Sequence, residues 1–263
     1  MKNQGLLEQV SEKLKLRNWK NQEFNIFNAC SIENQELAHS SFIANLLDPQ
    51  GTHSCGNLFL KSFLETLKVT VDTVDIDKLK DNIWVETEKT FSNGRLDILI
   101  KSKTENAYLL IENKIYAGDE EKQILRYREY LNEQSNKHKE TRKGILLYLT
   151  VNGKPASDYS TDGKVERNRP NGYYTISYYK TIRNWLSSCL TAKLSSRVKL
   201  ALEQYLELID FLNFEADLRD ELLPKITEDD IDEALKKNRD NKIKSALEYL
   251  KYSKRIRKNG III

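Results

Sequence analysis

Two apolar strand patterns are interrupted by charged residues, and this feature constrains the fold more than any other. The first pattern covers residues 94–100 and carries Asp97, and the second covers residues 108–115 and carries Glu112 and Lys114. Successive side chains of a strand point to opposite faces, so Glu112 and Lys114 share one face. We expect the two strands to pair. Pairing would bring two carboxylates and one ammonium group together, away from the apolar core face.

Charged residues inside an apolar strand need a physical reason, because burying an unpaired charge is costly. A structural reason would be an ion pair between Glu112 and Lys114 on a half-exposed strand, which contributes about 0–1 kcal/mol. A chemical reason would be a centre for phosphodiester cleavage, in which the carboxylates bind a divalent metal and the ammonium group contacts phosphate. Asp97 stands at the matching depth of the neighbouring strand, and this favours the chemical interpretation.

Hydrophobic periodicity predicts a mixed α/β chain. Strands are expected at residues 83–91, 96–100, 108–115, 144–151 and 173–177, with a hairpin at Asn93-Gly94, where both residues tolerate positive φ. Residues 152–171 are rich in Gly, Pro, Ser, Asp and Asn and should form a long loop. Helices are expected at residues 5–18, 22–29, 34 or 35 to 47, 58–68, 118–136, 179–191, 196–214 and 228–256.

The length of 263 residues suits one substantial domain with an appendage. We expect an N-terminal helical segment at 1–30, a core at 31–191, and a C-terminal helical region at 192–263. No stretch approaches the roughly 20 apolar residues that span a bilayer, and no apolar signal region follows Met1. Three distant cysteines favour reduced thiols over disulfides or structural zinc. A cytoplasmic protein without membrane association is therefore expected; the cysteines are Cys30, Cys55 and Cys189.

The C-terminal region contains a strongly basic segment. Residues 236–258 include ten basic and two acidic residues, a net charge of +8, and the chain total of +3 leaves −5 for the remainder. Such a segment can be a phosphate-binding surface or an ordinary solvated helix face. A further alternative is that its apolar side packs on the core or mediates self-association. The apolar side comprises Ile243, Ala246, Leu247 and Leu250. The sequence therefore leaves open whether the chain forms homo-oligomers.

Three motifs together resemble the PD-(D/E)XK nuclease superfamily, which includes restriction endonucleases and lambda-type exonucleases. They are Gly94-Arg95-Leu96-Asp97-Ile98, Ile111-Glu112-Asn113-Lys114, and Gln123-x-x-x-Tyr127. An earlier stretch is similar to one bacterial branch of the superfamily: Glu36-Leu37-Ala38-His39-Ser40, Leu46-Leu47-Asp48-Pro49 and Gly51-x-His53. The resemblance covers about residues 31–190. It departs from the family spelling at Leu96, where the eponymous proline would stand.

The resemblance implies an αβββαβ restriction-endonuclease-like core with a central mixed sheet, flanked here by N- and C-terminal helices. It also implies a Mg²⁺ cofactor, which Mn²⁺ could replace, held by Asp97, Glu112 and the backbone carbonyl of Asn113. The metal would polarise the scissile phosphate and activate water. Lys114 would orient that water and offset charge on the phosphorane. Glu36 would add a carboxylate that supports the metal ligands or binds a second metal ion, unless it only interacts with the helix dipole.

The remaining expected site residues would contact substrate. Gln123 and Tyr127 lie one helical turn apart, and in exonuclease-like members this motif holds the substrate end or the catalytic lysine; ordinary helix packing is the alternative. His39 could contact phosphate or a water, although a single helical histidine is more often structural. Arg95 lies beside Asp97 and could contact backbone phosphates, as could Arg126 and Arg128. A dense tyrosine cluster could stack bases but more often belongs to a core; it comprises Tyr173, Tyr174, Tyr178 and Tyr179.

The resulting expectation is a Mg²⁺-dependent nuclease acting on DNA. RNA stays open as a substrate, because none of these residues reads a 2′-hydroxyl. One alternative is a nucleic-acid-binding module that keeps the fold without cleavage, and another is a helical assembly protein whose charged strands are incidental. All catalytic positions are filled, which favours the enzyme.

Overall fold

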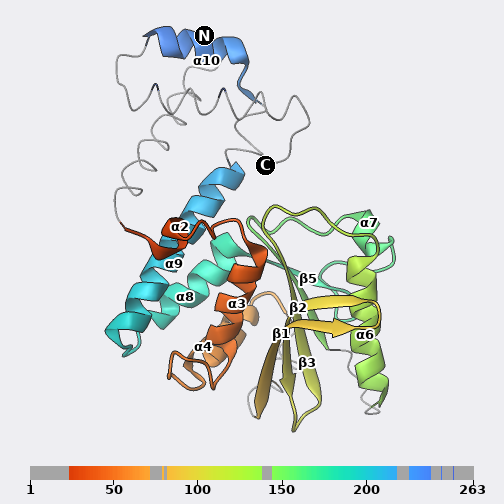
Figure 1. Cartoon of the computed structure of the whole chain (residues 1–263). Coiled ribbons are helices and arrows are strands. Elements are labelled where there is room, and N and C mark those ends of the chain that lie inside the picture. Colours follow the sequence, from red (N-terminus) through yellow and green to blue (C-terminus); the bar gives the residue numbers. More distant parts are fainter. Residues whose placement is uncertain are drawn as a thin grey trace. The chain divides into compact units, whose positions relative to one another are not determined.

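The computed structural model describes residues 24–71, 79, 82–137, 144–217, 225–237, 244 and 251. The chain divides into two compact units, one formed by Ser31–Ile209 and the other by Met1–Cys30 with Asp210–Ile263 (Figure 1). The predicted helix at 5–18 and most of the basic segment lie outside the described residues. The candidate site residues all belong to the Ser31–Ile209 unit.

A five-stranded mixed sheet forms the centre of that unit (Figure 1). Its strand order is β1-β2-β3-β4-β5, with antiparallel pairing of β1 with β2 and of β2 with β3, and parallel pairing from β3 to β5. The predicted α/β class with a central mixed sheet is confirmed. The strands are β1 (Ile83–Phe91), β2 (Gly94–Ser102), β3 (Ala107–Lys114), β4 (Ile145–Thr150) and β5 (Tyr174–Ser177).

Helices cover both faces of the sheet. Figure 1 shows α3, α4 and α8 on one side and α6 on the other. The order α3–α4, β1–β2–β3, α6, β4 reproduces the expected αβββαβ core. The helices described in this unit are α3 (Glu36–Leu47), α4 (Leu58–Leu67), α6 (Gln123–Lys137), α7 (Asp158–Thr161), η2 (Tyr178–Ile182), α8 (Arg183–Cys189) and α9 (Ser196–Asp217). The short α7 lies inside the predicted long loop, and η2 is a π-helical turn. The last residues of α9, from Asp210 on, belong to the other unit. The second unit also contains α2 (Ile26–Ala29) and α10 (Glu228–Lys237).

The β1–β2 hairpin fixes the register of the first two strands. Its turn consists of Ser92 and Asn93, and the last strand pair joins Phe91 to Gly94. Gly94 has a φ of +154°, and a Cβ atom there would lie 3.2 Å from the Phe91 ring. The turn therefore falls one residue earlier than the predicted Asn93-Gly94 pair, while glycine is required where the strands close.

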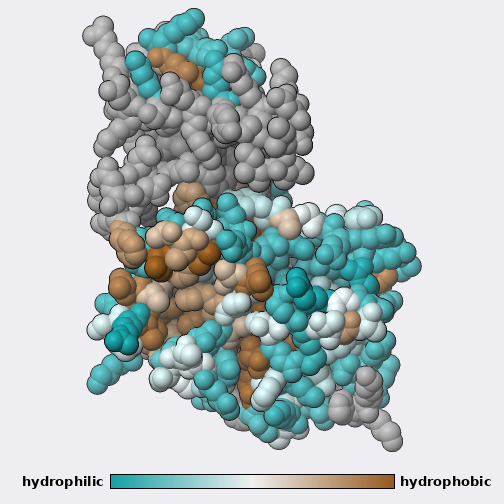
Figure 2. Space-filling view, in the orientation of Figure 1, coloured by the Kyte–Doolittle hydropathy of each residue, from teal (hydrophilic) through white to brown (hydrophobic). Residues whose placement is uncertain are grey.

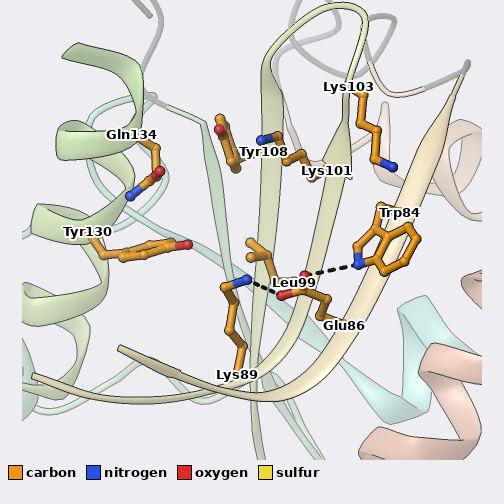
Figure 3. Close-up of a pocket in the computed structure, with 9 residues that line it drawn as sticks. All are labelled: Trp84, Glu86, Lys89, Leu99, Lys101, Lys103, Tyr108, Tyr130 and Gln134. Carbon is orange, nitrogen blue, oxygen red and sulfur yellow. Dashed lines mark hydrogen bonds and ion pairs between the residues drawn. The ribbon is translucent and has the colours of Figure 1, made fainter. Parts of the chain in front are cut away.

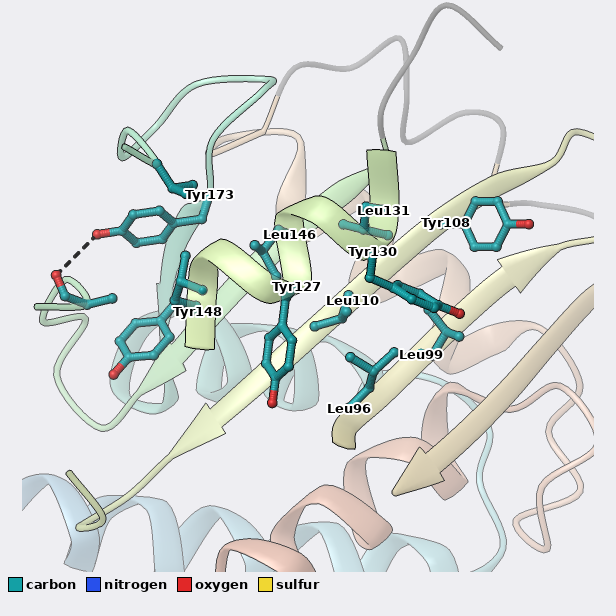
Figure 4. Packing of buried hydrophobic residues seen from close by; sticks show 13 residues of the cluster. Leu96, Leu99, Tyr108, Leu110, Tyr127, Tyr130, Leu131, Leu146, Tyr148 and Tyr173 are labelled. Carbon is teal, nitrogen blue, oxygen red and sulfur yellow. Dashed lines mark hydrogen bonds between the residues drawn. The ribbon is translucent and has the colours of Figure 1, made fainter. Parts of the chain in front are cut away.

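The α6 face of the sheet is packed, not open. Ile124 and Leu131, on the sheet-facing side of this helix, are fully buried. They pack in a cluster with apolar and tyrosine side chains from β2, β3 and β4 (Figure 4). Every residue of β4 is buried, so that both faces of this strand are covered. The expectation that the charged face of β2 and β3 points away from a core is therefore wrong, because α6 lies over it.

The outer surface of α6 and α7 is polar, in keeping with the one-sided burial of α6 (Figure 2). On the opposite side of the sheet, α4 and α8 meet through a ring contact between Phe63 and Trp185, whose centroids are 4.9 Å apart.

In the part of the chain that the structure describes, no helix is both long and apolar enough to cross a membrane.

Candidate active site

Asp97 and Glu112 face each other where β2 and β3 separate. The ladder between these strands ends at the pair Ile98–Ile111, so that continuing its register sets Asp97 opposite Glu112. Beyond that pair, the backbone N–H of Asn113 donates to Asp97 Oδ2 at 2.7 Å. The Asp97 carboxylate thus takes over a bond that a strand carbonyl would otherwise accept. The predicted pairing of the two carboxylates is what the strand geometry produces.

Lys114 lies beside the same pair. Its Nζ is 3.1 Å from Glu112 Oε1, and both side chains are buried, with only 1% of Glu112 exposed. The second oxygen, Glu112 Oε2, is buried without any hydrogen-bond partner. An ion pair alone would not leave that oxygen unsatisfied at such depth, because a buried acceptor without a donor costs about 1–3 kcal/mol.

The electrostatics of the three groups reflect this crowding. Burial, together with the neighbouring Asp97 carboxylate, raises the pKa of Glu112 well above its ordinary value. Burial likewise raises the pKa of Asp97, although the Asn113 N–H opposes that shift. For Lys114, burial alone would lower the pKa, but the surrounding carboxylates outweigh it, with Glu112 contributing most, and the pKa is raised. The lysine therefore stays protonated, and the two carboxyl groups compete for protons.

The donor set fits a hard divalent cation. When ionised, the adjacent carboxylates of Asp97 and Glu112 can only accept, so that a cation shared between them would satisfy the unpartnered Glu112 Oε2. Within the described residues, no group of three or more His, Cys, Asp or Glu side chains is arranged to hold a metal. The protein ligands that the resemblance implies are these two carboxylates and the Asn113 backbone carbonyl, with water and phosphate oxygens completing the shell, and Mg²⁺ is commonly bound by such oxygen donors.

Glu36 approaches the end of β3 from the first turn of α3. Its Oε1 accepts three consecutive backbone N–H groups, from Ile115 at 2.7 Å, Tyr116 at 3.2 Å and Ala117 at 3.1 Å. This carboxylate therefore holds the chain directly after Lys114, and its charge helps to raise the pKa of the lysine. The Oε1 atom is already engaged by three donors, so a role in fixing the position of Lys114 fits this geometry better than direct metal binding.

The side chain of Asn113 points away from the carboxylates, toward α3. Its Nδ2 donates to Ser40 Oγ at 3.0 Å and to the Glu36 carbonyl at 3.1 Å, and its Oδ1 accepts from the Tyr178 hydroxyl at 2.8 Å. All of this side chain's donors and acceptors have partners. Sequence reasoning missed this network, because Tyr178 lies 65 residues away in η2.

His39 belongs to the same buried side and not to the carboxylate side. Its Nδ1 lies 2.7 Å from the Tyr205 hydroxyl, and its Nε2 lies 3.0 Å from the Glu33 carbonyl. Burial lowers the pKa of this histidine to about 4, with the Glu33 carbonyl opposing the shift. A neutral ring with both nitrogens engaged does not match the predicted contact with phosphate.

Gln123 and Tyr127 lie in the first five residues of α6, and Tyr127 packs with Leu110 on the face of the sheet that carries Glu112 (Figure 4 shows Tyr127). Gln123 Nε2 donates to the Tyr127 hydroxyl at 3.0 Å, and that hydroxyl donates to the Arg95 carbonyl at 2.6 Å. Burial, with the Glu112 carboxylate adding to it, raises the pKa of Tyr127. Gln123 Oε1 is buried without a partner. The pair therefore lies beside the centre, with one acceptor unused.

A third carboxylate, Glu88, was missed from the sequence. It occupies the β1 position opposite Asp97, between the pairs Thr87–Ile98 and Lys89–Leu96. Its φ of +53° is unusual for a non-glycine residue in a strand. A correct prediction of the two-residue turn at Ser92-Asn93 would have revealed Glu88, because the turn sets the register that places Glu88 opposite Asp97.

Arg95, predicted to contact substrate, is largely exposed beside the centre, with its Nε 2.6 Å from Glu88 Oε2. Of the other two arginines, Arg126 lies 3.1 Å from Glu120 Oε2. Arg128 is buried and donates to the carbonyls of Gly144 and Gly172, which ties loops together. Arg95 is therefore the best placed of the three for a phosphate.

Three of the four clustered tyrosines belong to the core, which was one of the two alternatives from the sequence. Tyr173, Tyr174 and Tyr178 are buried, and Tyr179 is 47% exposed. Base stacking by the three buried rings is therefore excluded without unfolding of the region.

Comparison with models of known protein families places the chain in a family. A family model described as the PD-(D/E)XK nuclease superfamily matches residues 24–207. No curated protein and no solved structure matches the chain. The matched range starts before α3, ends within α9 and contains every candidate site residue from Glu36 to Tyr127.

Proposed function

Because the chain belongs to the PD-(D/E)XK nuclease superfamily, we propose that it is a metal-dependent deoxyribonuclease whose active site is built from Asp97, Glu112 and Lys114. The family implies hydrolysis of phosphodiester bonds with divalent metal ions. The proposal adds DNA as the substrate, Mg²⁺ as the metal, with Mn²⁺ able to replace it, and these three residues as the catalytic group.

One observation carries the assignment: a buried Glu112 whose Oε2 lacks any partner lies beside a second carboxyl group and 3.1 Å from a buried ammonium. Structural ion pairs are normally satisfied on both sides, since unsatisfied buried charge is destabilising. A centre that is incomplete without a cation and an anion has the composition that phosphoryl chemistry requires. Strongly perturbed carboxyl groups also concentrate at functional sites.

Each residue has a distinct task in this proposal. Asp97, Glu112 and the Asn113 carbonyl would hold the cation, which stabilises charge on the phosphate and makes a nearby water a better nucleophile. Lys114 would keep its proton, because its pKa is raised, and would neutralise charge that builds on the phosphate oxygens. Glu36 would keep Lys114 in place by holding the backbone after it.

The neighbouring residues would act on substrate or on the scaffold. Arg95 would exchange its contact with Glu88 for a backbone phosphate. Gln123 and Tyr127 would contact the substrate strand or the metal-bound group through the unused Gln123 oxygen. His39 would stabilise the scaffold behind β3 as a neutral ring, in place of the substrate contact expected from the sequence.

The test is incubation of the purified protein with linear duplex, circular duplex and single-stranded DNA, and with RNA, in Mg²⁺, Mn²⁺ or EDTA. The expected result is cleavage of DNA in either metal and none in EDTA. Circular substrates separate internal cleavage from attack at ends. Asp97→Asn serves as the matched inactive variant, since it keeps the shape of the side chain and removes the charge.

Three results would contradict parts of the proposal. Equal cleavage by Asp97→Asn would show that the activity comes from elsewhere or from a contaminant. Cleavage of RNA alone would replace the substrate. Tight, metal-independent binding without cleavage in any condition would favour a nucleic-acid-binding module that retains the fold.

A further inference from the structure

A hollow lies further along the sheet face that carries Asp97 and Glu112. It has a volume of about 420 Å³ and is open to solvent between the β1–β2–β3 ribbon and α6 (Figure 3). Leu99 contributes to its floor, while Tyr130 and Gln134 reach it from α6. Polar and aromatic side chains complete the lining: Trp84, Glu86, Lys89, Lys101, Lys103 and Tyr108.

The hollow combines positive charge with aromatic rings. Lys103 Nζ lies 4.5 Å from the centroid of the Trp84 ring, and Lys101 Nζ lies 5.2 Å from that of Tyr108. Lys89 is paired with Glu86, whereas neither Lys101 nor Lys103 forms an ion pair with any described residue. Two ammonium groups are thus available for an anion beside the π-faces.

Two features of the lining rings favour a ligand in the hollow. Trp84 is 48% exposed, which is high for the largest apolar side chain. Tyr108 is only 3% exposed by contrast, and its hydroxyl, itself buried, has no hydrogen-bond partner. A buried hydroxyl normally finds a partner, so a ligand group that reaches this one would satisfy it.

The position of the hollow relates it to the active centre. Trp84, Lys101 and Tyr108 stand side by side across β1, β2 and β3, because the register pairs Lys101 with both aromatic residues. Asp97 and Glu112 form a parallel row on the same face, four residues away along β2. At a strand rise of about 3.3 Å per residue, the two rows are about 13 Å apart.

We propose that this hollow, hereafter the Trp84 pocket, binds one unpaired nucleotide of the substrate strand on one side of the cleaved bond. The base would stack on Trp84, Lys101 and Lys103 would contact its phosphates, and the Tyr108 hydroxyl would form a hydrogen bond to the nucleotide. Aromatic faces combined with a positive groove are the means by which single strands are held without sequence preference. A paired base is stacked between its neighbours and cannot present its face to Trp84. The inference rests on the proposed nuclease function and narrows its substrate to single-stranded or frayed nucleic acid.

The experiment measures binding of labelled oligonucleotides by fluorescence anisotropy in EDTA, where no cleavage is expected. Trp84→Ala should weaken binding of a single strand about tenfold, the effect of losing one stacked base, and should leave a blunt duplex unaffected. The double variant K101A/K103A should reduce the slope of log affinity against log salt by about 1.4, since each lost contact to a single strand accounts for about 0.7. The control is K61A/K193A, which removes the same charge from exposed positions outside the pocket.

An abasic scan locates the contact. A single abasic nucleotide is moved along the strand, and the position at which it weakens binding to the wild-type protein should be neutral in Trp84→Ala. That position should lie a few nucleotides from the cleavage site in Mg²⁺. If the wild-type protein cleaves nucleic acid but the pocket variants bind like the control, the pocket inference is overturned and the nuclease function stands. If the wild-type protein neither binds nor cleaves any nucleic acid, both are overturned.

Discussion

Adjacent residues of β3 show opposite kinds of polar chemistry on the two faces of one sheet. Toward α3, the side chain of Asn113 is neutral, and its amide is bonded to Ser40 and its carbonyl to Tyr178. Toward α6, Glu112 is equally buried, yet one of its oxygens has no partner and its neighbour is another carboxyl group. Burial alone therefore does not separate the two faces of β3. They differ in that one carries an unpartnered carboxylate oxygen beside a second carboxyl group.

The contrast has a physical basis. A satisfied buried network fixes positions, because every displacement breaks a bond that water cannot replace. An unsatisfied carboxylate destabilises the metal-free protein and becomes favourable once a cation is present. One strand can thus combine a rigid support with a reactive face, and outer-shell support of this kind is what holds ligands in a productive geometry.

The largest expected effect comes from removing the ammonium group of Lys114, which lies on the same face of β3 as Glu112. Lys114→Ala should lower the turnover of the substrate by about 10²- to 10³-fold, the usual result of losing one donor that stabilises a charged transition state. The circular dichroism spectrum should be unchanged. Turnover is measured at saturating substrate and metal, with Lys61→Ala as the control for loss of a lysine on the exposed side of α4. A rate near that of the wild type would remove Lys114 from the mechanism.

On the side of β3 that faces α3, His39 should make the free energy of unfolding fall at acid pH. His39 has a folded-state pKa of about 4 against an ordinary value of 6.5, because burial disfavours its charged form. A depressed pKa means that its stabilising contribution is complete above pH 6.5 and is lost as the pH falls toward 4, a loss of about 3 kcal/mol. Urea unfolding between pH 7 and 4 measures it. His39→Gln should show a flatter dependence over this interval, and parallel curves for the two proteins would exclude the histidine as the cause.

Much of the fold was predictable from local patterns. Alternation identified β2 and β3, and the Asn93-Gly94 signal located the hairpin to within one residue. The unbroken apolar run of residues 144–151 is typical of a strand that is buried on both faces, as β4 is. Asp48-Pro49 correctly ended α3 at Leu47, because the residue before proline avoids helical backbone. These features depend on neighbours in sequence, which is why sequence alone was sufficient.

Other features depend on distant segments and could not be derived in this way. The burial of Glu112 requires α6 to cover the sheet, and periodicity gives no helix–sheet distance. Alternation along β2 would set Leu96 on the same face as Ile98, but Leu96 packs in the cluster beneath α6 with Leu99 and Tyr127 (Figure 4). Simple alternation therefore fails near the hairpin. Tyr178, which bonds to Asn113, and Tyr205, which bonds to His39, come from η2 and α9, far along the chain. The pairing of charged residues was foreseen, whereas their state of satisfaction was not.

A smaller effect should follow from replacing Glu112 by glutamine, whose side chain can find hydrogen-bond partners for both of its polar atoms. In metal-free protein, the raised pKa of Glu112 means that stability is greatest when the group is protonated and falls as the pH rises through the folded-state pKa. Glu112→Gln cannot ionise, and its amide can donate to Asp97 while its carbonyl accepts from Lys114. It should be more stable than the wild type at alkaline pH by about 1–3 kcal/mol, the cost of one unsatisfied buried acceptor.

Thermal unfolding in EDTA over a pH series measures this difference. The control is Glu65→Gln, which changes an exposed carboxylate paired with Lys68 and should leave the pH dependence as it is. Curves for Glu112→Gln that run parallel to those of the wild type would show that Glu112 is satisfied in solution, and the contrast between the two faces of β3 would then disappear.

The smallest expected effect on turnover comes from the side of β3 that faces α3. Tyr178→Phe removes the hydroxyl that donates to Asn113 Oδ1 at 2.8 Å and leaves the ring in place. The buried Oδ1 then lacks this donor, which costs about 1–3 kcal/mol, so the melting temperature should fall by about 2–4 °C for each kcal/mol. Turnover at saturating metal should stay near that of the wild type, since no reacting group is touched, while the metal concentration for half-maximal rate should rise modestly as the Asn113 backbone loosens. Tyr179→Phe, the exposed neighbour, is the matched control. If Tyr178→Phe lost as much turnover as Lys114→Ala, the two faces of β3 would act as a single unit, and hydrogen-bond satisfaction would not distinguish support from chemistry in this protein.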